Sequence, residues 1–354
     1  MGRERLTYFA QTVPGVEEIA WLELRARLPN VKFERYLYAA DTHGIVSFTF
    51  EGDPATLTDL WTVEDVFWQA LMRKLERTRR DLVDIGRWLQ AEESVGRAAH
   101  ALMRYRKFAR PPVYRLRVRQ FGQHVYDKRQ LESAVSRALK KRLFPWLPCP
   151  PDQKPDVEIQ ADLLGSWFLC GFRLTPVPDR NKKRALRQAD IRPSLAAAMA
   201  FLSQPTPDDV FLDPFCGQGY VLRWRQQMGR FYRLLGGDNV STAVLQRSQR
   251  ALRRRFNPLP SICQWQANQL PLATASVNVV AGRLPSKTAV ACTASLSELA
   301  RVVMPGGRLV LLCRDYELVK ECIRQVPELQ IQTGYSVKDG NKWGRIYILH
   351  RQSS

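Results

Sequence analysis

Residues 210–222 read VFLDPFCGQGYVL, and this stretch decides the fold of the second half of the chain. An apolar run, Val210–Leu212, ends at Asp213, and a loop with Gly217 and Gly219 leads into renewed apolar spacing. This order predicts a strand, a glycine turn and a helix, the opening unit of a doubly wound α/β sheet. Glycine suits the turn because a ligand must approach its backbone closely, and helix N–H groups behind it attract an anionic group. A plain strand-to-helix turn contains the same residues, so the rest of the chain must decide.

Downstream residues extend the same sheet. Residues 234–238, LLGGD, predict a second strand that ends in Asp238, about 20 residues after the glycine loop. A carboxylate at this position accepts hydrogen bonds from the ribose hydroxyls of an adenosine cofactor, although a helix-capping aspartate is the alternative. Residues 296–313 predict a helix, a Pro-Gly-Gly turn and a strand, and Leu329–Tyr335 with Arg345–His350 predict a closing antiparallel hairpin.

Charge indicates the partner. The 354 residues carry a formal net charge of +20 with a pI near 10.0, and much of the excess lies between residues 73 and 142. Such a charge favours nucleic acid, with a solvated basic surface or a membrane-surface role as alternatives. The 7 cysteines form no C-x-x-C pair, and the 4 histidines show no metal-ligand spacing, so we expect no metal site. We expect a cytoplasmic protein without membrane spans, because no signal-peptide pattern or long apolar segment is present.

The first half predicts two α+β modules. Residues 6–10 and 45–50 alternate as strands, with a helical pattern in residues 14–28 between them. A basic module follows: a helical pattern over Leu82–Tyr105, a strand over residues 113–121, and a helix over Asp127–Leu143. Residues 156–164 and 167–174 then predict a hairpin around Gly165, and residues 174–184 predict a linker. We expect the basic module to contact RNA phosphates through the arginines on one face of its strand and basic residues of the next helix: Arg115, Arg117, Arg119, Lys128, Arg129, Lys140 and Lys141.

Several motifs in order carry a family resemblance. They are PGVEEIA (14–20), RLRVRQFGQHVYDKRQLESAVSRALKKRL (115–143), PDVEIQADLLGSWFLCGFRL (155–174) and RQADIRPSLAAAMAFLSQPTPDDVFLDPFCGQG (187–219). The chain resembles the THUMP-containing S-adenosylmethionine (SAM)-dependent RNA methyltransferases, most closely the tRNA guanosine N2-methyltransferases. The resemblance implies a Rossmann-like methyltransferase domain, with a seven-stranded and mostly parallel sheet, preceded by an α+β RNA-binding module. It implies a ferredoxin-like domain (1–70), a THUMP domain (71–174), a linker (175–184) and the methyltransferase domain (185–354).

The resemblance also implies which residues hold SAM. The predicted cofactor-binding residues are Asp213, Pro214, Cys216, Gly217, Gly219, Asp238 and Gln266. Residue type alone favours Cys216 as a small packing residue. Gln266 stands where the family has an acid that binds the adenine amino group, and Asn278 replaces an acid at the start of the fourth strand. A glutamine oxygen can still accept a hydrogen bond from that amino group.

The catalytic motif departs furthest from the family. An Asp-Leu-Pro-Phe-like signature is expected after the fourth strand, whereas this chain has Arg283, Leu284, Pro285 and Ser286. An arginine has only donors and is always charged, so it cannot accept a hydrogen bond from the target amine. It can grip a phosphate or stack on a base. We therefore consider two functions: a tRNA or other RNA guanosine N2-methyltransferase, which is favoured, and a catalytically silent RNA-binding pseudoenzyme or partner subunit.

Overall fold

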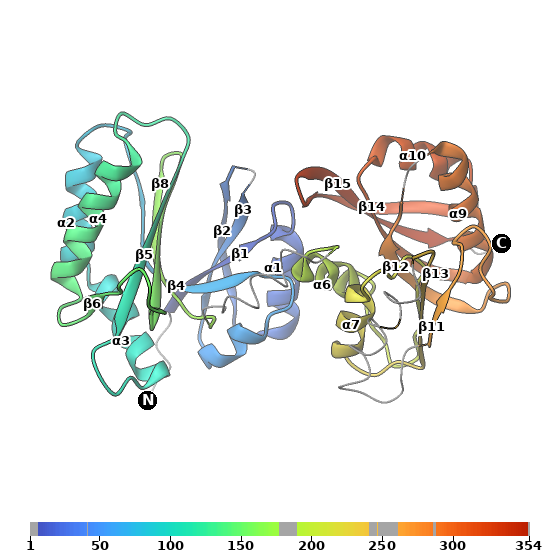
Figure 1. Ribbon diagram of the computed structural model, residues 1–354, viewed down its shortest axis with the longest axis horizontal. Coiled ribbons are helices and arrows are strands. Elements are labelled where there is room, and N and C mark those ends of the chain that lie inside the picture. The colour runs from blue at the N-terminus through green and yellow to red at the C-terminus, as the bar shows by residue number, and fades with distance from the viewer. Residues whose placement is uncertain are drawn as a thin grey trace. The chain divides into compact units, whose positions relative to one another are not determined.

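The computed structural model describes residues 6–40, 42–176, 190–240, 246, 261–285 and 288–352. The chain divides into two compact units, Met1–Arg180 and Asn181–Ser354, and each is built around its own sheet (Figure 1). The division lies within the predicted linker.

Unit 1 contains an eight-stranded sheet in the order β2-β3-β1-β4-β8-β7-β5-β6. All neighbours pair antiparallel except that β5 runs parallel to both β7 and β6. The hairpin predicted around Gly165 is present between β7 and β8, and Gly165 adopts a φ of 60° in its turn. The strands are β1 (Leu6–Thr12), β2 (Lys32–Ala39), β3 (His43–Phe50), β4 (Asp65–Lys74), β5 (Val113–Phe121), β6 (Leu147–Pro148), β7 (Val157–Leu164) and β8 (Trp167–Arg173).

The helices of unit 1 are α1 (Glu17–Arg27), a 3-10 turn (Pro54–Asp59), α2 (Asp81–Ala91), α3 (Glu93–Arg106) and α4 (Lys128–Arg142). The helical pattern over Leu82–Tyr105 is divided between α2 and α3, because Glu92 is extended with a ψ of 128°. The break lets α2 pack beside α4 while α3 packs on β4 and β8 (Figure 1). Helix α4 begins at a capping box formed by Asp127 and Gln130, as the sequence of a helix start requires.

The predicted boundary at residue 70 falls inside β4, which pairs with β1 on one side and β8 on the other. One hydrophobic core runs from Tyr8 to Leu174 across that boundary. The two parts of unit 1 therefore share one sheet and one core, and their division into ferredoxin-like and THUMP domains stays a prediction.

Unit 2 has the predicted Rossmann-like fold, with a seven-stranded sheet in the order β11-β10-β9-β12-β13-β15-β14. The strands from β11 to β13 are parallel, and β15 is antiparallel to both of its neighbours. The strand order reverses between β9 and β12, so the connections that follow these two strands run to opposite faces of the sheet. They leave a crevice at the carboxyl ends of the strands, where ligands bind in such sheets. The strands are β9 (Val210–Asp213), β10 (Arg233–Asp238), β11 (Ser261–Gln264), β12 (Val277–Arg283), β13 (Val303–Cys313), β14 (Leu329–Asp339) and β15 (Lys342–Arg351).

Four described helices cover the sheet of unit 2: α6 (Pro193–Leu202), α7 (Tyr220–Gln227), α9 (Ala289–Val302) and α10 (Tyr316–Arg324). Helix α6 packs against α7 and α9 packs against α10, and the two pairs lie on opposite sides of the sheet (Figure 1). The predicted Pro-Gly-Gly turn is a bulge within β13 rather than a separate turn, and Gly306 there has a φ of 76°.

The closing hairpin is longer than predicted. Its turn consists of Gly340 and Asn341 alone, so Asp339 and Lys342 form the last strand pair. Gly340 has a φ of 64°, as two-residue hairpin turns of this kind require. The extra strand length brings Asp339 and Lys342 to the same edge of the sheet as the glycine loop.

Candidate active site

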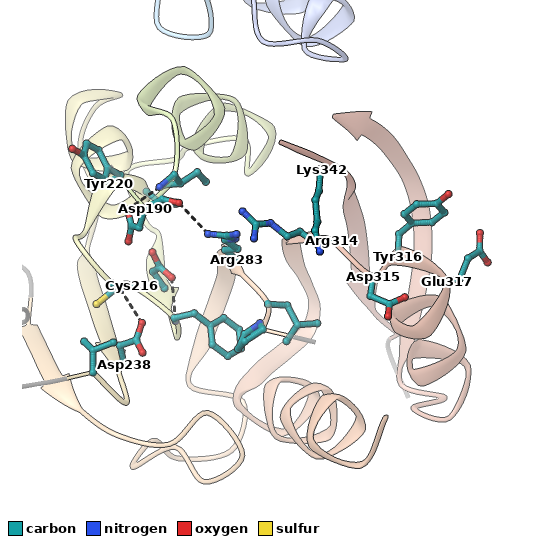
Figure 2. Close-up of a pocket in the computed structure, with 18 residues that line it drawn as sticks. Asp190, Cys216, Tyr220, Asp238, Arg283, Arg314, Asp315, Tyr316, Glu317 and Lys342 are labelled. Atoms are coloured by element: carbon teal, nitrogen blue, oxygen red, sulfur yellow. Dashed lines mark hydrogen bonds between the residues drawn. The ribbon is translucent and has the colours of Figure 1, made fainter. Parts of the chain in front are cut away.

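A pocket of about 870 Å³ opens at the carboxyl edge of the parallel strands in unit 2 (Figure 2). Asp213 ends β9, Asp238 ends β10 and Arg283 ends β12, and all three line it. Arg314, directly after β13, and Lys342, the first residue of β15, line the opposite side. Five strands far apart in the sequence thus contribute side chains to one site.

The glycine loop forms the floor of the pocket and needs glycine for two reasons. Gly217 has a φ of 45°, and a Cβ at this position would lie 2.4 Å from Oδ2 of Asp190. Gly219 has a φ of 75° and is the N-cap of α7, where its N–H donates to the carbonyl oxygen of Cys216. A side chain at residue 217 would therefore strain the backbone and displace Asp190.

Three carboxylates surround this loop. Asp238 Oδ2 accepts from the N–H of Gly217 at 2.9 Å, and Asp190 Oδ2 accepts from the N–H of Gln218 at 3.1 Å. Asp213 Oδ1 accepts from the N–H of Phe215 at 3.2 Å. Burial raises the pKa of Asp213 well above its ordinary value, and burial also raises the pKa of Asp238, with the other two carboxylates adding to the effect at Asp213. This side of the pocket is suited to a positively charged ligand, which would relieve the repulsion.

The opposite side is basic. Arg283 Nη1 donates to the backbone carbonyl of Asp190 at 3.0 Å, and its Nη2 lies 2.8 Å from Oδ2 of Asp339. Nε of Arg314 lies 2.8 Å from the same oxygen. Asp339 is only 3% exposed, so two guanidinium groups share one buried carboxylate. Arg283 is thereby held by two contacts, one with the segment before α6 and one with the closing hairpin.

Sequence reasoning missed four residues of this site: Asp190, Arg314, Asp339 and Lys342. Asp190 lies within the quoted segment 187–219 but carried no expected role. Arg314 follows a predicted strand of the parallel sheet, and the rule that ligands bind at carboxyl ends would have identified it. No comparable signal identifies Asp339 and Lys342, because the predicted strands of the hairpin end at Tyr335 and begin again only at Arg345.

Three predicted cofactor residues do not line the pocket themselves. Pro214, Gly219 and Gln266 are not among the described residues that line it. Pro214 instead accepts a hydrogen bond from Trp265 through its carbonyl oxygen, and Gln266 is exposed in a turn that bridges to Gln269. Cys216 does line the pocket but is only 4% exposed, and burial raises the pKa of its thiol, as expected of a packing residue.

Two of the three remaining positions of the catalytic motif line the pocket. Leu284 is buried and lines the pocket with the more exposed Pro285, whereas Ser286 lies outside the described residues. Asn278 has a structural role at the opposite end of β12: its Oδ1 accepts from the N–H of Val210 at 2.8 Å and thereby ties β12 to β9. An amide at this position therefore supports the sheet and does not reach the pocket.

The predicted RNA-binding residues fall into two groups. The arginines on the strand face engage acceptors of unit 1: Arg117 pairs with Glu158 at 2.7 Å, and Arg119 pairs with Asp162 at 2.7 Å. Arg115 donates to backbone carbonyls, including that of Gln153 at 2.6 Å. The basic residues of α4, in contrast, are exposed: Lys128, Arg129, Lys140 and Lys141. Much of the charge of the strand face is therefore compensated within the protein.

Among the described residues, no group of three or more His, Cys, Asp or Glu side chains is arranged to hold a metal ion. No described helix is both long and apolar enough to cross a membrane.

Comparison with known proteins bears on the same unit. Residues 180–343 match the family model "UPF0020: RMKL-like, methyltransferase domain". The tRNA (guanine(6)-N(2))-methyltransferase THUMP3 of Mus musculus is 31% identical over 181 residues, which are 45% of this chain and 36% of that protein. The U6 snRNA (guanine-N(2))-methyltransferase THUMPD2 of Bos taurus is 28% identical over 168 residues, 46% of this chain and 33% of that protein. The matches thus span well under half the length of these relatives.

Solved structures share the fold over the whole chain. TrmN from Thermus thermophilus has a TM-score of 0.76 at 21% identity, with 98% of this chain and 100% of that chain covered. SMU.472, a putative methyltransferase complexed with S-adenosylhomocysteine (SAH), has a TM-score of 0.71 at 13% identity and 99% coverage of both chains. At these identities the likeness shows the fold alone.

The match to a methyltransferase domain agrees with the predicted class of cofactor, S-adenosylmethionine. Residues 180–343 of this chain are similar to the methyltransferase domain of the RMKL-like family, and the predicted resemblance to THUMP-containing RNA guanosine N2-methyltransferases is confirmed.

Proposed function

We propose that this protein transfers a methyl group from SAM to the N2 amine of a guanosine in RNA, and that the RNA is a tRNA. The observation that carries the proposal is the pocket at the carboxyl edge of a methyltransferase-family sheet, where three carboxylates surround a glycine loop. The relatives named for guanine N2 methylation of tRNA and U6 snRNA support the choice of amine and of RNA. The predicted cytoplasmic location stays a prediction.

The pocket fits the cofactor in charge and in shape. SAM carries a sulfonium and an ammonium group, and the carboxylates of Asp190, Asp213 and Asp238 provide the negative charge that would hold them. Asp238 ends β10, where a carboxylate is placed to accept from ribose hydroxyls. Gly217 leaves the backbone accessible to close approach. When bound, SAM supplies an electrophilic methyl group.

The other residues of the pocket orient the substrate and exclude water. Leu284 and Pro285 follow Arg283 directly after the end of β12 and form an apolar wall of the pocket. Arg283 cannot accept the proton of the attacked amine, so its part in the proposed reaction is to position the RNA.

A second function rests on the same arginine. The guanidinium of Arg283 occupies the position where the family has an acceptor, and its contacts with Asp190 and Asp339 hold it there. This arrangement favours a catalytically silent RNA-binding protein that keeps the methyltransferase fold. Only the first function includes methyl transfer. Binding of the cofactor and of RNA is compatible with both functions and does not distinguish them.

Two measurements test the proposal. Calorimetry with SAH should show binding to the wild type, and Asp238→Ala should weaken it by about 1–3 kcal/mol, because partners of the carboxylate lose their hydrogen bonds. Glu328→Ala, which removes an exposed carboxylate of the same unit, is the control and should bind like the wild type. An absence of binding by the wild type would rule out cofactor use.

The second measurement is tritium transfer from labelled SAM into unmodified tRNA, followed by nucleoside analysis. The proposed enzyme yields N2-methylguanosine with the wild type. If the wild type binds SAH and tRNA but transfers no methyl group, while Arg283→Asp combined with Ser286→Phe gains transfer, the silent protein is the correct interpretation.

A further inference from the structure

The basic side of the pocket contains more positive charge than the protein itself compensates. Arg283, Arg314 and Lys342 line it, and the buried carboxylate that contacts the two guanidinium groups is that of Asp339 alone among the described residues. Lys342 has no acidic partner in the described part of the chain. Two guanidinium groups against one carboxylate leave a net positive charge, which a further anion can compensate.

The acids at the outer edge of the pocket do not remove this excess. Asp315 Oδ1 accepts from the N–H of Leu318 at 3.2 Å and caps α10. Figure 2 shows Glu317 directed away from Arg283, whereas Arg314 and Lys342 lie near the middle of the pocket beside it. Across the pocket, Asp238 lies away from these basic groups, whereas Asp190 contacts Arg283 through its backbone carbonyl (Figure 2).

The pocket is thus divided by charge: an acidic side around the glycine loop and a basic side at the ends of β12, β13 and the closing hairpin. A cationic cofactor satisfies the first side. The second side matches a phosphate, because guanidinium and ammonium groups are the usual phosphate ligands and a guanidinium presents several N–H donors in one plane.

We propose that Arg283, Arg314 and Lys342 form a binding site for a backbone phosphate of the RNA next to the nucleotide that enters the pocket. The buried carboxylate of Asp339 acts as a positioning residue, since it holds both guanidinium groups at the edge of the sheet. In this site the arginine at the family's acceptor position becomes an anchor for the substrate. The inference rests on the RNA substrate of the proposed function and not on methyl transfer.

The test is the salt dependence of tRNA binding by the full chain, measured by fluorescence anisotropy. Each phosphate contact contributes somewhat under one unit to the slope of log affinity against log salt. The double variant Arg314→Gln with Lys342→Gln should flatten the slope by about one unit, because it removes two of the three cations of the site.

The matched control is Lys320→Gln with Arg324→Gln. It removes the same pair of residue types from the exposed surface of α10, and Arg324 is ion-paired to Glu321 as Arg314 is to Asp339. The control should leave the slope within half a unit of the wild type, on the same scale of about one unit per contact. A charge-conserving variant, Arg314→Lys with Lys342→Arg, changes both side chains but keeps both positive charges. It should keep the wild-type slope, which shows that the flattening in the Gln pair comes from lost charge and not from a disturbed fold.

Each outcome decides the inference. Flattening by the Gln pair alone supports it, even if the wild type transfers no methyl group. Equal slopes for the Gln pair and the wild type overturn it, even if the wild type is an active methyltransferase. Equal flattening by both charge-removing pairs also overturns it, because the effect is then general electrostatics of unit 2.

Discussion

Substitution of Gly217 by alanine tests the geometry of the glycine loop. Residue 217 has a φ of 45°, and a left-handed conformation costs an alanine about 1–2 kcal/mol. The new Cβ would also lie 2.4 Å from Oδ2 of Asp190, so that carboxylate must move. Its displacement weakens the hydrogen bond from the N–H of Gln218, which is worth about 1 kcal/mol. We expect the free energy of unfolding to fall by about 2–3 kcal/mol in total.

The matched control is Gly306→Ala. Gly306 lies in the bulge of β13 with a φ of 76°, and nothing lies within 4 Å of the position of its Cβ. This variant carries the backbone strain without the steric conflict, so we expect a loss of about 1–2 kcal/mol. The difference between the two variants isolates the contact with Asp190.

Two assays separate stability from binding. Urea unfolding gives the free energies of unfolding, and calorimetry with SAH gives the affinities. Gly217→Ala should lower the affinity for SAH at least tenfold, about 1.4 kcal/mol, because it displaces the carboxylate of Asp190, which lines the pocket. Gly306→Ala should bind like the wild type. Equal affinities for the two variants would refute the assignment of this loop to the cofactor.

Three further predictions concern charge. Burial raises the pKa of Asp213 and Asp238 above the ordinary value of 3.8. At pH values between the ordinary and the raised pKa, the free protein therefore holds protons on these carboxylates, and a cationic cofactor displaces them. SAM should therefore bind more tightly as the pH rises through the raised pKa values, with proton release visible by calorimetry in two buffers of different ionisation enthalpy, and a pH-independent affinity would contradict this. Arg119→Gln should lower the free energy of unfolding by about 2–4 kcal/mol, because it leaves the buried Asp162 without its guanidinium partner. Lys141→Gln should instead flatten the salt dependence of tRNA binding with little change in stability, and the reverse pattern would restore Arg119 as a phosphate contact.

Patterns local in the sequence determined the fold of unit 2. An apolar run followed by spaced glycines predicts a strand, a tight turn and a helix, because few other structures satisfy both the periodicity and the backbone freedom of glycine. Asp238 was identified for the same reason, since the spacing from one strand end to the next is set by a single helix of ordinary length. The closing hairpin was predicted from alternation, but not its turn, which determined where Asp339 and Lys342 lie.

The face of β5 shows what local patterns leave open. Alternation correctly placed Arg115, Arg117 and Arg119 on one face, since successive side chains of a strand point to opposite sides. The acidic partners of Arg117 and Arg119 lie on β7, which pairs with β5 in a parallel register that the sequence does not reveal. The structure shows Arg117 and Arg119 in ion pairs and Arg115 bound to backbone carbonyls, and the RNA-binding role of all three stays a prediction.

The chemistry of the pocket was decided by tertiary structure. Asp190, Arg283 and Asp339 are distant in the sequence, and they meet because parallel strands and the closing hairpin end at one edge of the sheet. The sequence by itself determined that an arginine replaces the family's acceptor. Only the tertiary structure showed that a buried carboxylate holds this arginine beside a second guanidinium, because the contacts of a charged side chain depend on which strands become neighbours and not on its position along the chain.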